Sequence, residues 1–342
     1  MIATPASLYD DAKVEDSPPR PFYNEKNTIR RMNMKLKEWI TEWLTTYVKP
    51  TAKTRTYQRY SEIVYKQIIP KLGEYDLADL TTGVLQRYIN ELLESGNKRT
   101  GGGLSPSSVA TIVCVLQNCL RTAFNLGYSV IYAADKLKRP KPVMREVVCF
   151  STVEQKKIEQ AVICGKKNKL FGILLCLYTG LRIGELLALR WSDIDMAKGL
   201  LTISRSCHDG KGKDGGFIRI EESPKTVSSC RTIPLPKGLL PYIKEVKAKT
   251  QSRYVVSSGE KPISVRSYQR TFEILLRKLG IPHKGFHALR HTFATRALEF
   301  GMDVKTLSEI LGHKSATVTL NRYVHSLMEH KRDMMNRIFK GI

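Results

Sequence analysis

The sequence predicts a mainly helical α+β protein, with a small antiparallel β-sheet in its second domain and an all-α helical bundle as its first. Apolar residues recur at helical spacing along much of the chain. Three short segments, 200–203, 217–220 and 231–233, have instead the composition of strands. A length of 342 residues is enough for two domains that each bury a core.

The first domain is expected at residues 34–135, after an N-terminal tail. Residues 1–33 lack apolar periodicity and contain a cluster of prolines, so we expect a disordered or extended segment there. A cap residue followed by proline, Ser105-Pro106, is a helix start signal. Apolar spacing and this signal predict four helices, over 36–47, 54–69, around 85–92 and from 106 to 124.

A basic linker is expected at residues 136–148. It contains five Lys or Arg side chains between 136 and 146, and its prolines Pro140 and Pro142 oppose a helix and favour an extended chain. Such a segment could lie along a phosphate backbone or act as a solvated hinge. The residues alone do not choose between these interpretations.

The second domain is expected at residues 149–342. Ser151 and Glu154 have the spacing of a capping box at its first helix. The apolar run from Leu170 to Leu181 is too short to span a bilayer and is typical of a buried helix. The three strand segments follow, and helices resume from about residue 236, interrupted by a short apolar run near Val255.

The charge of the chain favours a polyanionic partner. It contains 56 Lys and Arg against 32 Asp and Glu, a formal net charge of +24. Residues 1–148 contribute 22 basic and 15 acidic side chains and residues 149–342 contribute 34 and 17, so both halves are positive. Because each neutralised phosphate releases counterions, nucleic acid is the favoured partner. An indifferent basic surface and attraction to anionic lipid are the alternatives.

The cysteines and the missing motifs narrow the class of protein. The 7 cysteines are odd in number and contain no Cys-x-x-Cys pair, which indicates reduced thiols in a cytosolic protein and neither disulfides nor a zinc site. The first residues lack the apolar core of a signal peptide. Neither G-x-x-x-x-G-K-[ST] nor G-x-G-x-x-G occurs, so we expect no nucleotide cofactor and no use of ATP.

Five short motifs in the second half bring together the side chains that phosphate chemistry needs. Arginine can bind a phosphate bidentately, lysine can protonate a leaving oxygen, and tyrosine can attack and hold the phosphate covalently. The motifs are Thr179 to Glu185, Ser223 to Thr226, His287 to His291, Leu311 to His313, and Tyr323.

A metal site at the third of these motifs is not expected. His287 and His291 are four residues apart, as in some zinc-binding helices. Arg290 lies on the same helical face and would repel a dication, and the glutamate of a His-Glu-x-x-His site is absent.

In composition and order, these motifs resemble those of the tyrosine recombinase (phage integrase) family. With the Tyr-x-His continuation of the last motif to His325, the motifs cover residues 179–325, and the expected helical domain has a suitable size and position before them. The resemblance implies that Arg182 and Arg290 bind the scissile phosphate, that Lys225 protonates the leaving 5′ oxygen, and that Tyr323 is the nucleophile.

The resemblance also implies supporting roles for the remaining side chains. His287 and His313 would hydrogen-bond the phosphate. Because a free tyrosine has a pKa near 10, the attacking tyrosine needs a proton acceptor, and His287 is the candidate base. Glu185 would orient Arg182, or otherwise serve as a capping or surface acid. His291 is interpreted as a residue that supports the site or packs behind it.

By resemblance, the expected activity is site-specific recombination without metal, cofactor or ATP. The reaction passes through a 3′-phosphotyrosyl link that conserves the bond energy, so no ATP is needed. By resemblance the partners are double-stranded DNA at core recombination sites, clamped between the helical and catalytic domains, and a homotetramer on two such sites. An accessory DNA-bending or directionality protein is a further expected partner. The expected location is the bacterial cytoplasm or nucleoid, with no membrane association.

Two expectations concern the ends of the chain. The segment 327–339 has an apolar face, which either docks on a neighbouring protomer or folds back on its own core; the side chains are Leu327, Met328, Met334, Met335, Ile338 and Phe339. Larger integrases of the family have an arm-site DNA-binding domain before the helical bundle, for which residues 1–33 are too few. Either the enzyme works without arm sites or this sequence lacks that part.

Several functions remain open at this point. The leading hypothesis is an integrase of a mobile element, such as a phage or a conjugative transposon. A resolvase of chromosome or plasmid dimers would use the same chemistry, and a type IB topoisomerase would share it without exchanging partners. A DNA-binding regulator with an idle cleavage centre is a hypothesis of another class, against which the intact set of residues argues.

Overall fold

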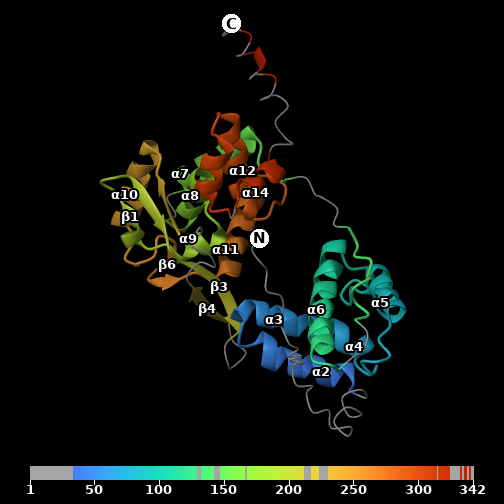
Figure 1. Cartoon of the computed structure of the whole chain (residues 1–342). Coiled ribbons are helices and arrows are strands. Elements are labelled where there is room, and N and C mark those ends of the chain that lie inside the picture. The colour runs from blue at the N-terminus through green and yellow to red at the C-terminus, as the bar shows by residue number, and fades with distance from the viewer. Residues whose placement is uncertain are drawn as a thin grey trace, which may run out of the picture. The chain divides into compact units, whose positions relative to one another are not determined.

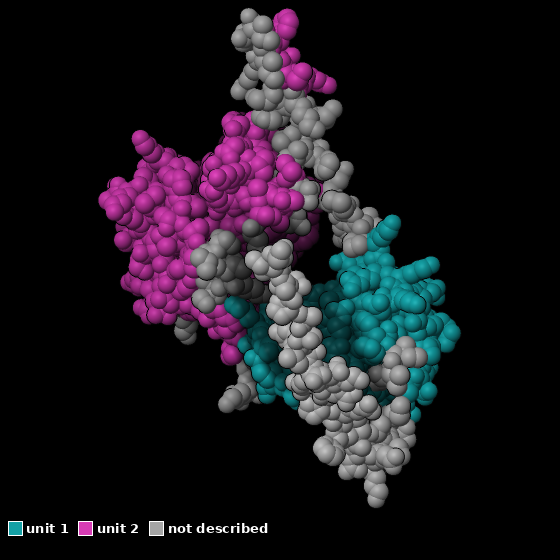
Figure 2. Space-filling view, in the orientation of Figure 1, with its two compact units in different colours: residues 1–144 teal, residues 145–342 magenta. Residues whose placement is uncertain are grey.

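The computed structural model describes residues 34–128, 132–141, 147–165, 168–211, 217–222, 230–313 and 315–323, with a few single positions beyond residue 331. The chain divides into two units, residues 1–144 and 145–342 (Figures 1 and 2). Each unit has its own buried apolar core.

The first unit is helical throughout its described elements. The elements are α2 (Leu36–Trp43) with a π-helical turn Leu44–Val48, α3 (Thr54–Ile63) with a π-helical turn Val64–Ile68, α4 (Ile69–Leu72), α5 (Thr82–Ser95) and α6 (Pro106–Asn125). The helices expected from apolar spacing are confirmed, and Ser105 caps α6 by accepting from the amide of Ser108.

Helix α6 is central to the core of this unit. By length and composition it could cross a membrane, but its apolar face packs inside this core. The indole of Trp39 donates to the carbonyl of Cys119 at 3.2 Å. Leu137 belongs to the same core and Arg139 contacts the side chain of Gln117, so packed structure continues to residue 139, within the range expected for the linker.

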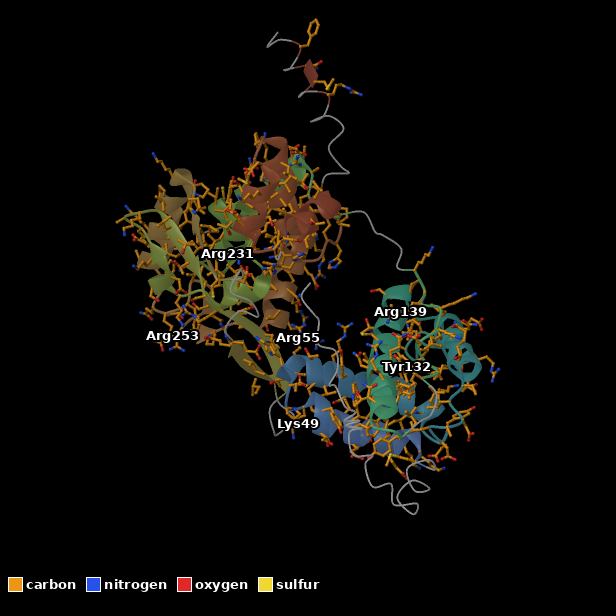
Figure 3. The ribbon with its side chains drawn as sticks, viewed as in Figure 1. Lys49, Arg55, Tyr132, Arg139, Arg231 and Arg253 are labelled. Atoms are coloured by element: carbon orange, nitrogen blue, oxygen red, sulfur yellow. The ribbon has the colours of Figure 1, made fainter. Side chains whose placement is uncertain are left out.

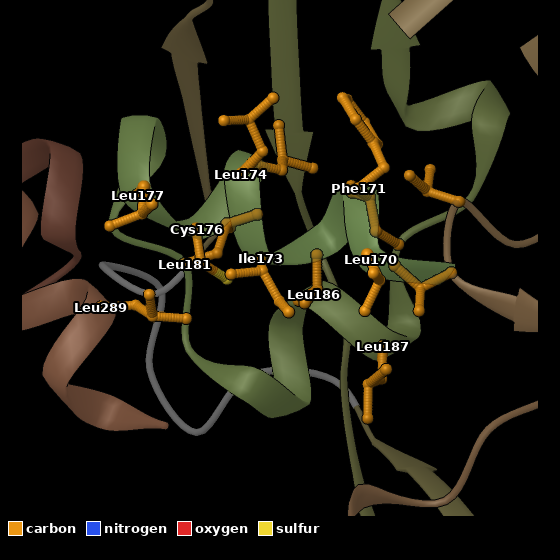
Figure 4. Packing of buried hydrophobic residues seen from close by; sticks show 14 of the residues in the cluster. Leu170, Phe171, Ile173, Leu174, Cys176, Leu177, Leu181, Leu186, Leu187 and Leu289 are labelled. Carbon is orange, nitrogen blue, oxygen red and sulfur yellow. The ribbon is translucent and has the colours of Figure 1, made fainter. Parts of the chain in front are cut away.

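The second unit begins with a series of helices, one of which is buried. They are α7 (Thr152–Cys164), a 3₁₀ turn Asn168–Leu170, α8 (Phe171–Thr179) and α9 (Ile183–Ala188). Ser151 and Glu154 form the expected capping box. The apolar run is confirmed as a buried helix, and Figure 4 shows Leu174 and Cys176 of α8 among the side chains of the core.

The strands of the second unit form three small antiparallel sheets. The first has the order β1-β2-β5, the second pairs β3 with β4, and the third pairs β6 with β7. In the first sheet the buried side chains Leu201 and Ile233 are paired. The strands are β1 (Ile194–Asp195), β2 (Leu200–Ile203), β3 (Ser206–Lys211), β4 (Phe217–Glu222), β5 (Arg231–Pro234), β6 (Ser257–Ser258) and β7 (Lys261–Pro262).

Two features of the sheets differ from the expectation. Strand β3 was not predicted, because its sequence Ser-Cys-His-Asp-Gly-Lys lacks the apolar and β-branched residues that signal a strand. Its pairing with β4 explains the second difference. The predicted strand segments were expected in one small sheet, but β4 and β5, which flank residues 223–229, belong to different sheets.

Helices complete the second unit. They are α10 (Leu240–Ala248), α11 (Val265–Lys278), α12 (His287–Glu299), α13 (Val304–Leu311) and α14 (Ala316–Tyr323). The apolar run near Val255 lies beside the end of α9, because the amide of Val255 donates to the carbonyl of Leu189 at 3.0 Å. The C-terminal segment 327–339 lies outside the described residues, apart from single positions.

Candidate active site

A left-handed glycine between α8 and α9 sets the position of Arg182. Gly180 has φ of +65°, and a Cβ atom there would lie 2.6 Å from Cδ1 of Phe293. Glycine is therefore needed for both the backbone conformation and the close packing. The turn places Arg182 at the N-cap of α9.

Arg182 and Glu185 are joined by two hydrogen bonds at the start of this helix. The amide of Arg182 donates to Oε2 of Glu185 at 2.9 Å, and its Nη1 donates to Oε1 at 2.8 Å. Glu185 therefore makes both contacts considered from the sequence, capping α9 and contacting the guanidinium. The side chain of Arg182 is 37% exposed, and its Nη2 also donates to the carbonyl of Gly312 at 3.2 Å.

A second arginine, Arg231 of β5, contacts the same carboxylate. Its Nη1 donates to Oε1 of Glu185 at 3.1 Å and its Nη2 donates to Oε2 at 3.0 Å. Burial raises the pKa of Glu185, but the hydrogen bond and charge of Arg231, followed by the charge of Arg182, outweigh burial and hold the pKa at about 2. The carboxylate is therefore ionised at neutral pH, although its side chain is only 7% exposed.

Sequence reasoning did not select Arg231 as a candidate. It stands five residues after the motif Ser223 to Thr226, at the start of β5, but no local pattern marks it as a site residue. The signal that was present is its alternation with buried Ile233, which places both residues on one face of β5.

Arg290 is almost fully buried at the centre of the site. It lies in the first turn of α12, with 1% of its surface exposed. Its Nη1 donates to the carbonyl of Gly180 and its Nη2 donates to the carbonyl of Leu311, both at 2.8 Å. Arg290 thus connects the backbone of the motif that contains Gly180 to the backbone of the motif that begins at Leu311.

The C-terminal end of α13 accepts hydrogen bonds from three arginines. The carbonyl of Ile310 accepts from Arg231, that of Leu311 from Arg290, and that of Gly312 from Arg182. The carbonyls at the end of a helix lack intrahelical donors and carry partial negative charge. They are therefore suitable anchors for a cluster of guanidinium groups.

His313 follows directly from this helix end. Gly312 is left-handed, with φ of +63°, and the amide of His313 donates to the carbonyl of Ser308 at 3.0 Å. Nδ1 of His313 lies 2.7 Å from Oγ1 of Thr319, a residue of α14 that is fully buried. This contact fixes the orientation of the imidazole ring.

The other two histidines lie in the first turns of α12. The rings of His287 and His291 meet edge to face, with centroids 4.5 Å apart. His287 is exposed and His291 is half-buried. His287 is thus the more accessible of the two for contact with a substrate.

The two remaining candidates are less fully described. Lys225 lies in residues 223–229, outside the described residues. Tyr323 is the last residue of α14, and the structure describes its backbone but not its side chain. Hydrogen bonds therefore bring together Arg182, Glu185 and Arg290 around the helix end that precedes His313. The catalytic roles of these residues, like those of Lys225 and Tyr323, stay predictions.

Matches to known proteins identify the class of protein that this fold and arginine cluster define. Residues 152–330 match the phage integrase family, and residues 35–93 match the N-terminal SAM-like domain of phage integrases. The chain belongs to the phage integrase family. It is a tyrosine-type site-specific recombinase, which confirms the family, fold class and enzyme class expected from the sequence.

Two relatives show the range of this similarity. The chain is 31% identical to the "Tyrosine recombinase XerC-like" protein of Caldanaerobacter subterraneus subsp. tengcongensis, over 86% of this chain and 80% of the relative. It is 25% identical to the ICEBs1 integrase of Bacillus subtilis, over 84% of this chain and 78% of the relative.

Two solved structures share the fold. The Tn1549 transposon integrase in complex with a circular intermediate DNA has a TM-score of 0.73 and 21% identity, with 89% of this chain and 99% of that chain covered. A lambda integrase tetramer bound to a Holliday junction has a TM-score of 0.64 and 22% identity, with 87% and 84% covered.

Proposed function

We propose that this protein is the integrase of a mobile element, which cuts and rejoins duplex DNA through a covalent link to Tyr323. The observation that carries the proposal is the clustering of Arg182 and Arg290 on the C-terminal end of α13, next to His313. Two fixed guanidinium groups provide donors for one phosphate before the substrate arrives. The similarity to the Tn1549 and ICEBs1 integrases supports the assignment to a mobile element.

The proposed reaction needs only side chains of this protein. Arg182 and Arg290 bind the non-bridging oxygens and stabilise the pentacoordinate transition state. The phenolic oxygen of Tyr323 bonds to phosphorus as the bond to the 5′ oxygen breaks. The phenol proton goes to His287, and the leaving 5′ oxygen takes a proton from Lys225. Attack by a 5′ hydroxyl of another duplex reverses these steps and completes strand exchange.

The first unit supplies further positive charge for DNA. Lys49, Arg55 and Arg59 are exposed, on α3 and the turn before it, and Figure 3 labels Lys49 and Arg55. Exposed basic side chains of this kind bind phosphates without reading sequence. We infer that residues 34–135 form a core-site DNA-binding domain, that residues 136–148 connect it to the catalytic domain at 149–342, and that the protein works in the bacterial cytoplasm or nucleoid.

We further propose that four protomers assemble on two DNA sites and that the segment 327–339 of one protomer docks on the next. A pocket of about 750 Å³ between α7, α8 and α12 has the apolar lining this needs, including Leu177, Phe293 and Met302. Phe300 at its rim is 89% exposed. An exposed aromatic beside an apolar pocket is typical of an interaction site.

The central experiment uses a DNA substrate that carries the cognate core site and a nick beside the cleavage position, so that cleavage cannot reverse. In EDTA, we expect a covalent protein–DNA adduct that peptide mapping assigns to Tyr323. Tyr323→Phe should bind the same DNA with a steep salt dependence and form no adduct. Tyr75→Phe, which removes an exposed hydroxyl in the first unit, is the matched control and should react normally.

Several outcomes would contradict this function. Binding without an adduct on a verified cognate site would indicate a regulator with an idle cleavage centre. Normal cleavage by Tyr323→Phe would show that the nucleophile is another residue, and loss of activity in EDTA would show that the mechanism needs a metal.

A dimer resolvase is the second candidate, because the XerC-like relative is 31% identical over 86% of this chain. Two plasmid assays separate the candidates. An integrase should join two different partner sites on separate plasmids, whereas a resolvase should delete DNA between two identical sites. Efficient deletion without any joining of separate plasmids would favour the resolvase.

The docking of the C-terminal segment is tested at the pocket rim. Phe300→Asp should leave binding to a single site unchanged and prevent formation of the complex with four protomers and two DNA sites, measured by analytical ultracentrifugation. Ile274→Asp, at an exposed apolar side chain of α11 outside the pocket, is the control. A normal four-protomer complex of Phe300→Asp would show that segment 327–339 does not dock there.

A further inference from the structure

We propose that Arg231 is a positioning residue for the recombination reaction: it holds Glu185 and the end of α13, and through them it fixes Arg182 for the phosphate. This proposal rests on the proposed role of Arg182 in phosphate binding. Arg231 comes from β5, in the first sheet of the second unit (Figure 3).

Three contacts of Arg231 lead to backbone or side-chain groups that border the site. Its Nε donates to the carbonyl of Ile310 at 2.6 Å, while Nη1 and Nη2 donate to the two oxygens of Glu185. This bidentate geometry is the strongest form of an arginine–carboxylate pair. The Arg231 and Glu185 side chains are each only 7% exposed, so water screens the pair weakly.

Arg231 also packs directly against Gly312. A Cβ atom added at Gly312 would lie 2.8 Å from Nη1 of Arg231 and 3.1 Å from its Cδ and Cζ atoms. The carbonyl of the same glycine accepts from Nη2 of Arg182, and the next residue is His313. Arg231 therefore supports the backbone at Gly312, which accepts a hydrogen bond from Arg182 and directly precedes His313.

The arrangement explains why Arg182 needs a second arginine behind Glu185. Arg182 uses two of its five guanidinium N–H groups for Glu185 and Gly312, which leaves three for a phosphate. Without Arg231, Arg182 would be the one cation among the described residues that contacts the buried carboxylate of Glu185. Arg182 would then be drawn toward Glu185 and away from the position that the phosphate requires.

The test compares two DNA substrates that differ in charge at the scissile position. In a methylphosphonate, a methyl group replaces one non-bridging oxygen, so the reacting group is neutral and gains little from a correctly placed Arg182. On the ordinary phosphodiester, at saturating protein, we expect Arg231→Gln to form the Tyr323 adduct about 100-fold more slowly than the wild type. On the methylphosphonate we expect a loss of about threefold or less, with DNA affinity unchanged on both substrates.

A matched control separates positioning from structural support. Arg219 of β4 is also mostly buried and donates to two carbonyls, those of Ile263 and Leu187, but it contacts Glu221 and not Glu185. Any loss of rate in Arg219→Gln should be equal on the two substrates. An equal loss on both substrates in Arg231→Gln, or no loss on the phosphodiester, would overturn the proposal.

Two further measurements keep the outcome clear. If Arg231→Gln does not fold, Arg231→Lys is used instead, since lysine keeps the charge but cannot bind both oxygens of Glu185 and the Ile310 carbonyl together; the same substrate dependence is expected, with a loss of about tenfold on the phosphodiester. Arg182→Gln should itself lose less of the rate of adduct formation on the methylphosphonate than on the phosphodiester. If it does not, or if the wild type forms no Tyr323 adduct, the proposed function has failed and not the role of Arg231 alone.

Discussion

Replacing Glu185 by glutamine should change how the stability of the second unit depends on pH. The carboxylate lies between Arg231 and Arg182, and Glu185→Gln keeps its size while it removes the charge. The pKa of Glu185 is lowered to about 2 from 4.5. Its contribution to stability should therefore be complete above the unfolded value of 4.5 and should be lost as the pH falls from there through about 2.

The magnitude follows from the pKa and from burial. Each pKa unit corresponds to about 1.4 kcal/mol, so the lowered pKa corresponds to about 3 kcal/mol at neutral pH. Because the side chain of Glu185 is only 7% exposed, little of this is lost to solvent screening. Removing one partner of a buried ion pair has a similar cost, about 3–5 kcal/mol.

The assay is urea unfolding at several pH values between 2.5 and 7. Unfolding is monitored by hydrogen exchange in a peptide that covers α8, so that the measurement reports the second unit alone. The wild type should exceed Glu185→Gln by about 3 kcal/mol at pH 7, and the difference should shrink steadily below about pH 4.5. Glu221→Gln is the control, because Glu221 also faces two arginines but is more exposed. Parallel stability curves for the wild type and Glu185→Gln would refute the reasoning.

Three further predictions concern single contacts. Gly180→Ala should destabilise the second unit by about 2–4 kcal/mol in the same unfolding assay, since alanine disfavours a positive φ and its methyl group would meet Phe293; a cost below about 1 kcal/mol would contradict this. Thr319→Val removes the hydroxyl beside Nδ1 of His313, and adduct formation should slow about tenfold at unchanged DNA affinity; a wild-type rate would show that the contact does not position the ring. Ser151→Ala should cost about 1 kcal/mol, because the capping box at α7 is lost, and an unchanged unfolding midpoint would count against that cap.

The helical elements were readable from the sequence because their signals are local. The apolar stripe of α2, the Ser105-Pro106 start of α6 and the Ser151 capping box each depend on residues within a few turns of one another. The strands were read less completely. Strand β3 is held by its pairing with β4 and lacks a local signal of its own, so its existence followed only from the tertiary structure.

The candidate site divides in the same way. The motif residues Arg182, Arg290 and His313 could be selected from the sequence, because their neighbours in the chain form recognisable patterns. The role of Arg231 could not be predicted, since its partners Glu185 and Ile310 come from distant parts of the sequence. Arg231 can be recognised as part of the site only from the contacts of its side chain.

The sequence by itself determined the family, the order of the motifs and the excess of positive charge, because these depend on residue identity and spacing along the chain. The tertiary structure decided how the guanidinium groups are held. Three arginines meet three successive carbonyls at the end of α13, and two of them share one buried carboxylate. Burial and proximity create that electrostatic arrangement, and neither quantity exists until the chain has folded.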